Sequence, residues 1–207
     1  SVKSYIGDKP LLFEEIDLSF LKNYQAHLKT EEKELTTIHG YLSKIRAIFN
    51  HAIQNDNLDF TVNPFISFKL KQGKANKDRL TIEEINSLEE LDLPEGSLLS
   101  HVRNAFLFSF YNAGIRISDI LLLTWDNIQE DRITYTMYKT SKPHSLKLKP
   151  KPLAILEKYK GRGESYIFPF FSDRYDYSDP MFMHNQISAK TALINKYLKE
   201  FQNLLNF

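Results

Sequence analysis

Apolar residues recur at helical spacing in the first third of the chain. They fall every three or four positions between 17 and 28, and again from about 35 to 53. This period places them on one helix face, so it predicts two amphipathic helices after an irregular start at 1–12. Asn63-Pro64 ends the helical region, because the residue before proline disfavours the helical conformation. The predicted buried faces contain Leu18, Leu21, Tyr24, Gln25 and Leu28, then Ile38, Leu42, Ile45, Ile48, Phe49 and Ala52.

The pattern changes after residue 66, where apolar residues become scarce and basic residues dominate. We interpret 69–79 as a basic linker between a helical domain, 1–68, and a second domain, 80–207. Thr81 and Glu84 have the spacing of a capping box, which predicts the start of a new helix. A further helix is expected over 98–112. The basic residues of the linker are Lys69, Lys71, Lys74, Lys77 and Arg79.

The second domain contains both strand and helix patterns. Apolar and polar residues alternate in 132–138 and again in 145–149, on either side of KTSKPH. This period of two predicts a β-hairpin with one basic face. The rest is predicted as a helix from Pro152 to Tyr159, a short apolar strand or packed loop at 166–171 and a helix from about 185. The whole pattern predicts an α+β fold that is mostly helical, with a small antiparallel sheet.

Composition sets the broad class of the protein. The chain has 207 residues, 42% hydrophobic and 26% charged, which fits one or two globular domains. The lack of cysteine excludes disulfides and cysteine metal sites and fits a reducing cytosol. No apolar run approaches the ~20 residues of a membrane span, so we expect a cytoplasmic protein without a membrane partner. The six histidines lack metal-site spacing, and the net charge of +1 carries no argument about nucleic acid.

The stretch NAGIRISDILLLTW places a charged pair directly before the most apolar segment. Gly114 permits a sharp exit from the preceding helix, and Ser118 is expected to cap a short helix over 119–123. Arg116 would then lie at a helix N-terminus, where it could bind a phosphate through two parallel hydrogen bonds. The alternative is a structural ion pair between Arg116 and Asp119, which spacing alone favours by about two to one.

The predicted hairpin is rich in lysine. Residues 139–151 contain five lysines and no acidic residue. A basic hairpin can contact the phosphate backbone of a nucleic acid. Lysines also protect the exposed edges of sheets, so a solvated edge strand is an equal alternative. The five are Lys139, Lys142, Lys147, Lys149 and Lys151.

Taken together, these segments resemble the tyrosine recombinase, or phage integrase, family. AGIRISDILLLTWDNI at 113–128 resembles its first catalytic box, in which glycine, an apolar residue, arginine and a later acid precede Leu-x-x-Leu-x-Trp. KTSK at 139–142 resembles the lysine turn of the family, and the helical segment 14–65 resembles its core-binding domain. Within the family, the chain resembles integrases of bacterial mobile elements.

The resemblance implies a two-domain clamp around double-stranded DNA in the bacterial cytoplasm. It implies site-specific recombination through a covalent 3′-phosphotyrosine, with no metal or nucleotide cofactor. Arg116 would hold the scissile phosphate, Lys139 would protonate the leaving 5′-hydroxyl, and Asp119 would support the site. The complete protein would form a tetramer on DNA, and this chain alone is expected to be a monomer. The expected DNA contacts are Lys69, Lys71, Lys74, Lys77, Arg79, Lys142 and Lys147.

The family pattern continues with His-x-x-Arg, a later His or Trp and a nucleophilic tyrosine. These 207 residues contain no His-x-x-Arg, and none of the eleven tyrosines can be assigned as the nucleophile. We therefore expect half a catalytic site and no DNA cleavage by this chain alone, as a fragment of a larger protein or the product of a truncated gene. Two alternatives stay open: a non-catalytic DNA-binding remnant or regulator that occupies recombination sites, and a helical adaptor with no role on DNA.

Overall fold

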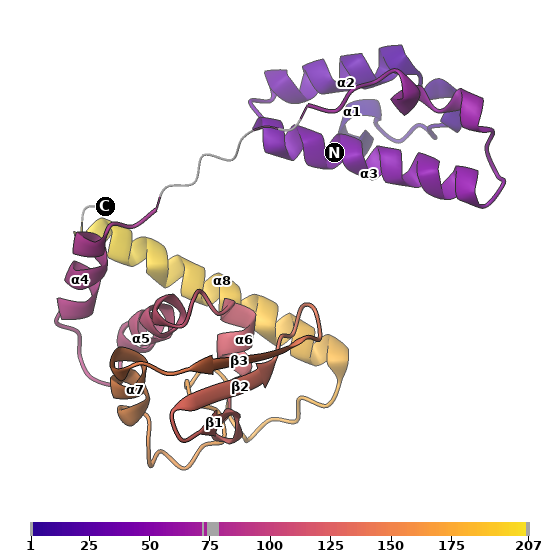
Figure 1. Cartoon of the computed structure of the whole chain (residues 1–207). Coiled ribbons are helices and arrows are strands. Elements are labelled where there is room, and N and C mark those ends of the chain that lie inside the picture. Colours follow the sequence, from indigo (N-terminus) through magenta and orange to yellow (C-terminus); the bar gives the residue numbers. More distant parts are fainter. Residues whose placement is uncertain (1, 72, 74–78, 206–207) are drawn as a thin grey trace. The chain divides into compact units, whose positions relative to one another are not determined.

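The computed structural model describes residues 2–71, 73 and 79–205. The chain divides into two compact units, 1–78 and 79–207. Helices dominate both units, and the described residues contain one small sheet, in the second unit (Figure 1). The predicted α+β fold is therefore confirmed. The helices of the first unit are α1 (Val2–Ile6), α2 (Leu18–Thr30) and α3 (Leu35–Gln54), with short 3-10 turns at Phe13–Glu15, Phe60–Val62 and Pro64–Ile66.

The first unit is built around the packing of α2 against α3. Asp17 caps α2, because its carboxylate accepts the Phe20 backbone N–H at 2.7 Å. The apolar faces of the two helices meet in a core, as their spacing predicts. The buried members of this core are Leu21, Tyr24, Leu28, Ile38, Leu42, Ile45, Phe49 and Phe68.

Two predictions for the first unit are wrong. Ile48 is 58% exposed, because it lies one position before the buried Phe49 and so projects about 100° away around α3. Residues 2–6 form α1 and are not irregular. The ring of Tyr5 packs at 5.2 Å from that of Tyr24, a tertiary contact that helical periodicity could not reveal.

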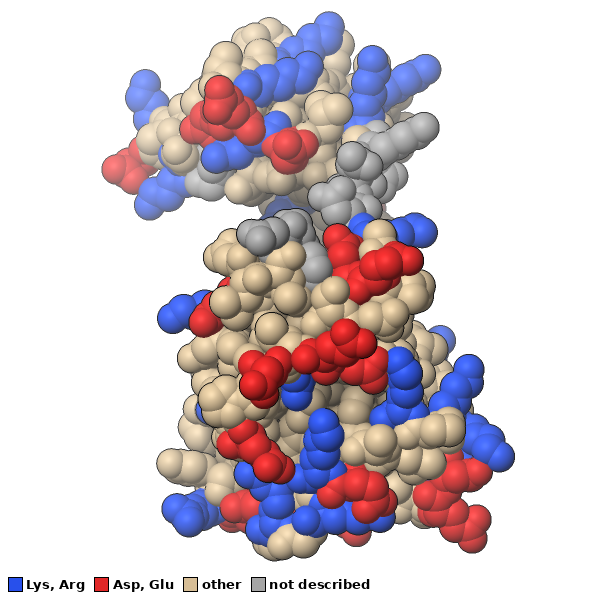
Figure 2. Space-filling view, turned by 90° about the vertical axis from the view of Figure 1, so that its left-hand side faces the viewer, with Lys and Arg blue, Asp and Glu red and all other residues tan. Residues whose placement is uncertain are grey.

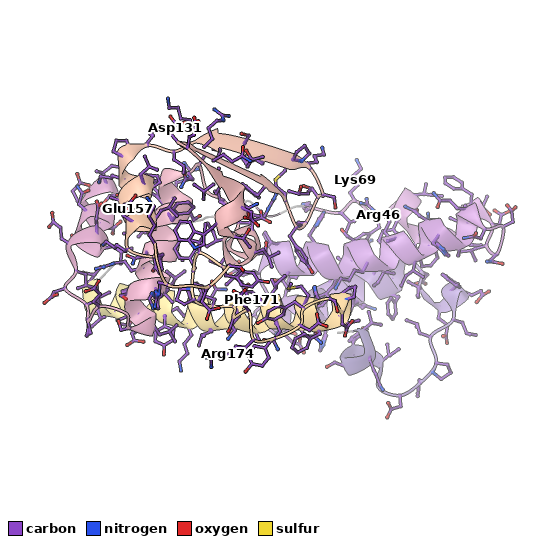
Figure 3. The ribbon with its side chains drawn as sticks, turned by 90° about the horizontal axis from the view of Figure 1, so that it is seen from below. Arg46, Lys69, Asp131, Glu157, Phe171 and Arg174 are labelled. Atoms are coloured by element: carbon purple, nitrogen blue, oxygen red, sulfur yellow. The ribbon has the colours of Figure 1, made fainter. Side chains whose placement is uncertain are left out.

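The second unit places α5 and α6 between a long helix, α8, and the sheet (Figures 1 and 3). The long helix contacts α4, α5 and α6, and α7 packs against α5. The sheet is antiparallel in the order β1-β2-β3, which makes β3 an edge strand. The elements are α4 (Ile82–Glu90), α5 (Leu98–Tyr111), α6 (Ile117–Leu122), a 3-10 turn (Trp125–Asn127), β1 (Ile128–Gln129), β2 (Arg132–Thr136), β3 (Pro143–Lys147), α7 (Pro150–Glu157) and α8 (Pro180–Leu205).

The hairpin of β2 and β3 is present, with a shorter turn than predicted. Tyr135 pairs with His144 across the strands. The Met137 N–H donates to the Lys142 carbonyl at 2.9 Å, so the turn closes there and β3 begins at Pro143. Proline is tolerated at this position because β3 is an edge strand.

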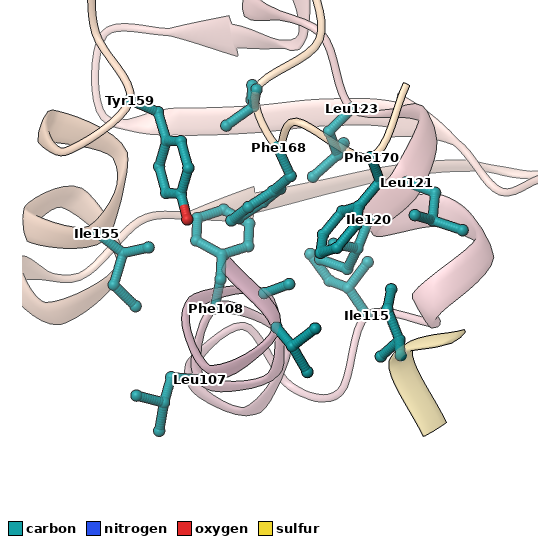
Figure 4. Close-up of a cluster of buried hydrophobic side chains, with 14 of the residues drawn as sticks. Leu107, Phe108, Ile115, Ile120, Leu121, Leu123, Ile155, Tyr159, Phe168 and Phe170 are labelled. Carbon is teal, nitrogen blue, oxygen red and sulfur yellow. The ribbon is translucent and has the colours of Figure 1, made fainter. Parts of the chain in front are cut away.

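The core of the second unit collects side chains from α5, α6, α7 and the loop after α7 (Figure 4). The rings of Phe108 and Phe168 lie 5.5 Å apart, and Phe168 also contacts the ring of Tyr159 at 5.1 Å. Ile120 and Leu121 of α6 are both fully buried. This packing fixes α6 firmly, and with it Arg116, the residue immediately before α6.

Two predicted helix starts in the second unit are corrected, and one of the two alternatives for 166–171 is confirmed. The helix expected from Pro152 begins at Pro150, and α8 begins at Pro180, because Asp179 accepts the N–H groups of its first turn. Residues 166–171 form a packed loop, joined by the Ile167 N–H to the Leu123 carbonyl at 2.9 Å. No helix in the described parts of the chain has the length and apolar character needed to cross a membrane.

Candidate functional site

The corner between α5 and α6 sets the position of Arg116. Gly114 has φ +76°, a left-handed conformation that glycine adopts readily, and its N–H donates to the Ser109 carbonyl at 2.9 Å. The Ser109 hydroxyl donates to the Ile115 carbonyl at 2.7 Å. The sharp helix exit predicted at Gly114 is thus confirmed.

Arg116 is the N-cap residue of α6, immediately before the first helical residue, Ile117. Its backbone carbonyl accepts the N–H groups of Asp119 and Ile120, both at 2.9 Å. The predicted cap at Ser118 is wrong, because α6 begins at Ile117 and Ser118 lies within its first turn. Arg116 therefore lies at a helix N-terminus, as predicted.

The guanidinium of Arg116 is exposed and is held by no carboxylate among the described residues. One of its terminal nitrogens lies 3.4 Å from the Met137 sulfur, next to the hairpin turn. A structural ion pair with Asp119 is absent from the described contacts. The alternative that spacing alone favoured is therefore wrong, and Arg116 keeps its full capacity to bind an anion.

Asp119 makes a different contact. It is 2% exposed, and one carboxylate oxygen accepts the Tyr138 backbone N–H at 2.8 Å. The other oxygen, Oδ2, is buried without a hydrogen-bond partner among the described residues. Burial and the charge of Asp119 raise the pKa of Tyr135, and the charge of Arg116 acts in the opposite direction. Asp119 thus ties α6 to the turn that carries Lys139.

The hairpin lysines divide into two groups. Lys139 and Lys142 are exposed in the turn and have no ion pair among the described residues. Lys147 pairs with Asp131 at 2.9 Å, and Lys151 pairs with Glu89 at 2.6 Å. Although 139–151 contain no acidic residue, Lys147 and Lys151 find acidic partners in segments that precede residue 139. Lys149 is exposed at the start of α7.

The structure describes only part of the basic linker. Lys69, Lys71 and Arg79 are exposed. Lys74 and Lys77 lie outside the described residues. The structure therefore brings Arg116, Asp119 and the Lys139 turn together within the second unit, and describes the linker residues only separately.

Comparison with known proteins finds similarity to phage integrases in one segment of the sequence and in the fold. Residues 1–86 match the sequence model of the phage integrase SAM-like domain. A lambda integrase dimer bound to a COC′ core site is similar in structure, with TM-score 0.62 and 19% identity over 95% of this chain and 67% of the other. The first 86 residues thus match the phage integrase SAM-like domain, and the chain has a fold similar to that of lambda integrase.

Further solved structures support the same fold for this chain. A lambda integrase tetramer bound to a Holliday junction gives TM-score 0.62 and 18% identity, over 91% of this chain and 54% of the other. Lambda integrase bound to DNA gives TM-score 0.58 and 17% identity, over 95% and 66%. The chain thus spans between about half and two thirds of these proteins. No curated protein sequence matches it.

Sequence reasoning missed the contacts that organise the candidate site. The Asp119–Tyr138 hydrogen bond joins residues 19 positions apart, and the Arg116–Met137 contact spans 21 positions. Neither has a local spacing signal. The sequence motif singled out Arg116 and Asp119 as candidate site residues. Their contacts with the hairpin turn are revealed only by the folded structure.

Proposed function

We propose that this chain is part of a site-specific recombinase that breaks and rejoins DNA through a covalent 3′-phosphotyrosine. The observation that carries the proposal is the link from Asp119 to the lysine turn. Arg116 and Lys139 have no ion pair among the described residues, and the two elements that carry them are joined by one buried carboxylate. An unpaired arginine beside a positioned lysine suits a phosphate with a leaving hydroxyl.

The two positive side chains would act at different points of the reaction. Arg116 would bind the non-bridging oxygens of the scissile phosphate and stabilise the charge of the transition state. Lys139 would donate a proton to the leaving 5′-hydroxyl as general acid. Asp119 would position the turn and take no part in proton transfer. These steps require no metal or cofactor, because the phosphotyrosine conserves the bond energy.

Double-stranded DNA is the proposed partner. The matched lambda integrase structures hold a core site, a Holliday junction or DNA, which supports this choice. Residues 1–68 would form the core-binding domain, 69–79 the linker and 80–207 the first part of the catalytic domain. The complete protein would assemble as a tetramer on DNA, and this chain alone would be a monomer. The proposed backbone contacts are Lys69, Lys71, Lys74, Lys77, Arg79, Lys142 and Lys147.

A non-catalytic DNA-binding regulator is the second candidate. It would need only the basic residues of the linker and of the hairpin turn. The regulator would bind DNA through the same basic residues and would leave Arg116 without a chemical role. A cleavage assay on the complete recombinase therefore separates the two candidates.

The test is Arg116→Ala in the complete recombinase, with a suicide DNA substrate that traps the covalent complex. We expect cleavage to fall by at least about a hundredfold, since charge-stabilising donors contribute on this scale. Thermal stability should stay nearly unchanged, because Arg116 is exposed and has no ion pair among the described residues. Arg174→Ala, in the loop before α8, is the control and should cleave normally (Figure 3). Retained cleavage with a large loss of stability would overturn the proposal.

A further inference from the structure

The second unit contains a polar pocket that the proposed recombination chemistry does not use. It has a volume of about 460 Å³ and lies between the start of α5 and the end of α7. That size is within the usual range for small-molecule sites. Leu93 and Gly96 form part of its wall, and Glu95 is its acidic lining residue.

Three basic side chains converge on this pocket without an ion pair among the described residues. They are Arg103, Lys158 and Arg162. With Glu95, the lining carries a net charge of about +2 at neutral pH. Acidic and basic side chains form neighbouring groups on the side of the second unit that shows α4 and α7 (Figure 2). Asp92 and Glu89 lie near Arg103 but make no ion pair with it in the described contacts.

Arg103 is the most constrained of the three. It is half-buried, and one terminal nitrogen donates to the Leu91 carbonyl. Its Nε atom is buried without a hydrogen-bond partner among the described residues, and burial lowers the pKa of the side chain. A buried N–H without a partner costs about 1–3 kcal/mol, so an anion that accepted this hydrogen bond would relieve an existing penalty.

The floor of the pocket is a buried hydrogen-bond network. The Asn104 amide donates to the Tyr159 hydroxyl at 3.1 Å, and this hydroxyl lies 3.0 Å from Nδ1 of His101. The hydroxyl already accepts from Asn104, so its proton is available to Nδ1 of a neutral His101. Burial, followed by the charge of Arg162, lowers the pKa of His101 and keeps the ring neutral. Arg162 also covers the Tyr159 ring at 5.5 Å.

We propose that this pocket binds a small phosphate-bearing anion. The two guanidinium groups supply the planar donors that match phosphate oxygens, and Lys158 adds a third charge. The buried network gives these cations a rigid polar floor. The pocket and Arg116 lie toward opposite ends of α5, and the ten residues from His101 to Tyr111 span ~15 Å of helix. The pocket is therefore separate from the proposed DNA-cleavage site.

Calorimetric titration of the chain with inorganic phosphate, at constant ionic strength, tests the proposal. We expect saturable binding, and Arg162→Gln should weaken it by about tenfold through loss of one charged contact. Arg162 is exposed, so this variant should fold normally. Arg174→Gln is the matched control and should bind as the unchanged chain does. A shift of the His101 ring signals in NMR on adding phosphate should accompany binding.

The competing outcomes separate the possible ligands. Adenosine monophosphate that binds more tightly than phosphate would identify a nucleotide, and equal binding would identify free phosphate. Failure to saturate below ~10 mM phosphate would overturn the proposal, because a Kd of ~10 mM corresponds to a binding free energy of only about −2.7 kcal/mol. Equal phosphate affinity in Arg162→Gln and the unchanged chain, or displacement of phosphate by duplex DNA, would also overturn it. Each of these leaves the recombinase assignment intact, because neither Arg116 nor Lys139 lines the pocket.

Discussion

At the scale of single residues, Arg116 and Asp119 have opposite surroundings although only two residues separate them. Arg116 is exposed, and Asp119 is 2% exposed. One oxygen of the buried carboxylate accepts a hydrogen bond from the Tyr138 N–H, and the other has no hydrogen-bond partner among the described residues. Burial of a carboxylate is unfavourable unless hydrogen bonds or opposite charges compensate for its lost solvation. We infer that the fold keeps Asp119 for the position of the lysine turn, and not as a counter-ion for Arg116.

This inference predicts a difference between two substitutions of Asp119. Asp119→Ala removes the acceptor for the Tyr138 N–H, so the free energy of unfolding should fall by about 1–3 kcal/mol. Asp119→Asn keeps an amide oxygen in the same place and should lose less. Urea denaturation measures the stability, and amide hydrogen exchange at Tyr138 measures the contact.

Exchange at Tyr138 should be slow in the unchanged chain and in Asp119→Asn, and fast in Asp119→Ala. Amides in the middle of α3 belong to the other unit and serve as the internal control, since their exchange should not change. Slow exchange at Tyr138 in Asp119→Ala would show that another group holds the turn.

The residues that sequence analysis placed correctly are those with local signals. Gly114 was placed by the demand of a sharp helix exit, and Arg116 by its position before an apolar helical segment. The partner of Asp119 had no such signal, because it is a backbone N–H on another element. The pairing of Lys147 with Asp131 had no such signal either, because Asp131 lies on another segment, before β2.

At the scale of elements, a polar contact joins three helices of the second unit. Glu89 of α4 accepts hydrogen bonds from Lys151 of α7 at 2.6 Å and from the Tyr111 hydroxyl of α5 at 3.0 Å. Lys151 also donates to that hydroxyl at 3.1 Å. The hydrogen bond from Lys151 is the largest cause that lowers the pKa of Glu89, and the one from Tyr111 adds to it.

The lowered pKa predicts how this contact responds to acid. A carboxyl group whose pKa is lower in the folded chain stabilises the fold above its unfolded pKa, about 4.3. That contribution is lost as the pH falls through the folded pKa. The stability difference between the unchanged chain and Glu89→Gln should therefore be constant near neutral pH and shrink below about pH 4. Thermal unfolding across this range measures it.

The control for this experiment is Glu90→Gln. Glu90 lies next to Glu89 on α4, is exposed and has no ion pair among the described residues. Its substitution removes the same charge without breaking the three-helix contact. An equal pH dependence in both variants would show that the contact itself contributes nothing.

Periodicity predicted which elements exist better than where they end. The helices α2, α3 and α5 and the hairpin follow from local spacing. The start of α8 was placed five residues late, because the capping at Asp179 precedes its regular apolar pattern. The hairpin turn was read as too long, since only the Met137–Lys142 hydrogen bond defines where it closes. Such boundaries depend on single hydrogen bonds.

At the scale of the whole molecule, the chain contains two separate hydrophobic cores. The described core of the first unit uses residues from 2 to 70, and that of the second uses residues from 85 to 205. The net charge is only +1. Any affinity for DNA must therefore come from the local arrangement of basic side chains, because the total charge gives no long-range attraction.

This requirement leads to a prediction about salt. Each phosphate that a lysine or arginine neutralises adds about 0.9 to the slope of log affinity against log salt. With six or more contacts, binding of duplex DNA by this chain should weaken by about a thousandfold between 50 and 200 mM salt. Fluorescence anisotropy with a labelled duplex at several salt concentrations measures the slope.

Two lysine substitutions decide whether the turn contributes to that slope. Lys142→Ala removes an exposed lysine with no described ion pair and should reduce the slope by about 1. Lys160→Ala removes a lysine that pairs with Glu157 on the surface and should leave the slope unchanged. Equal slopes in both variants would exclude the turn from the DNA interface. Binding that is absent, or that does not respond to salt, would favour the helical adaptor over both DNA-binding candidates.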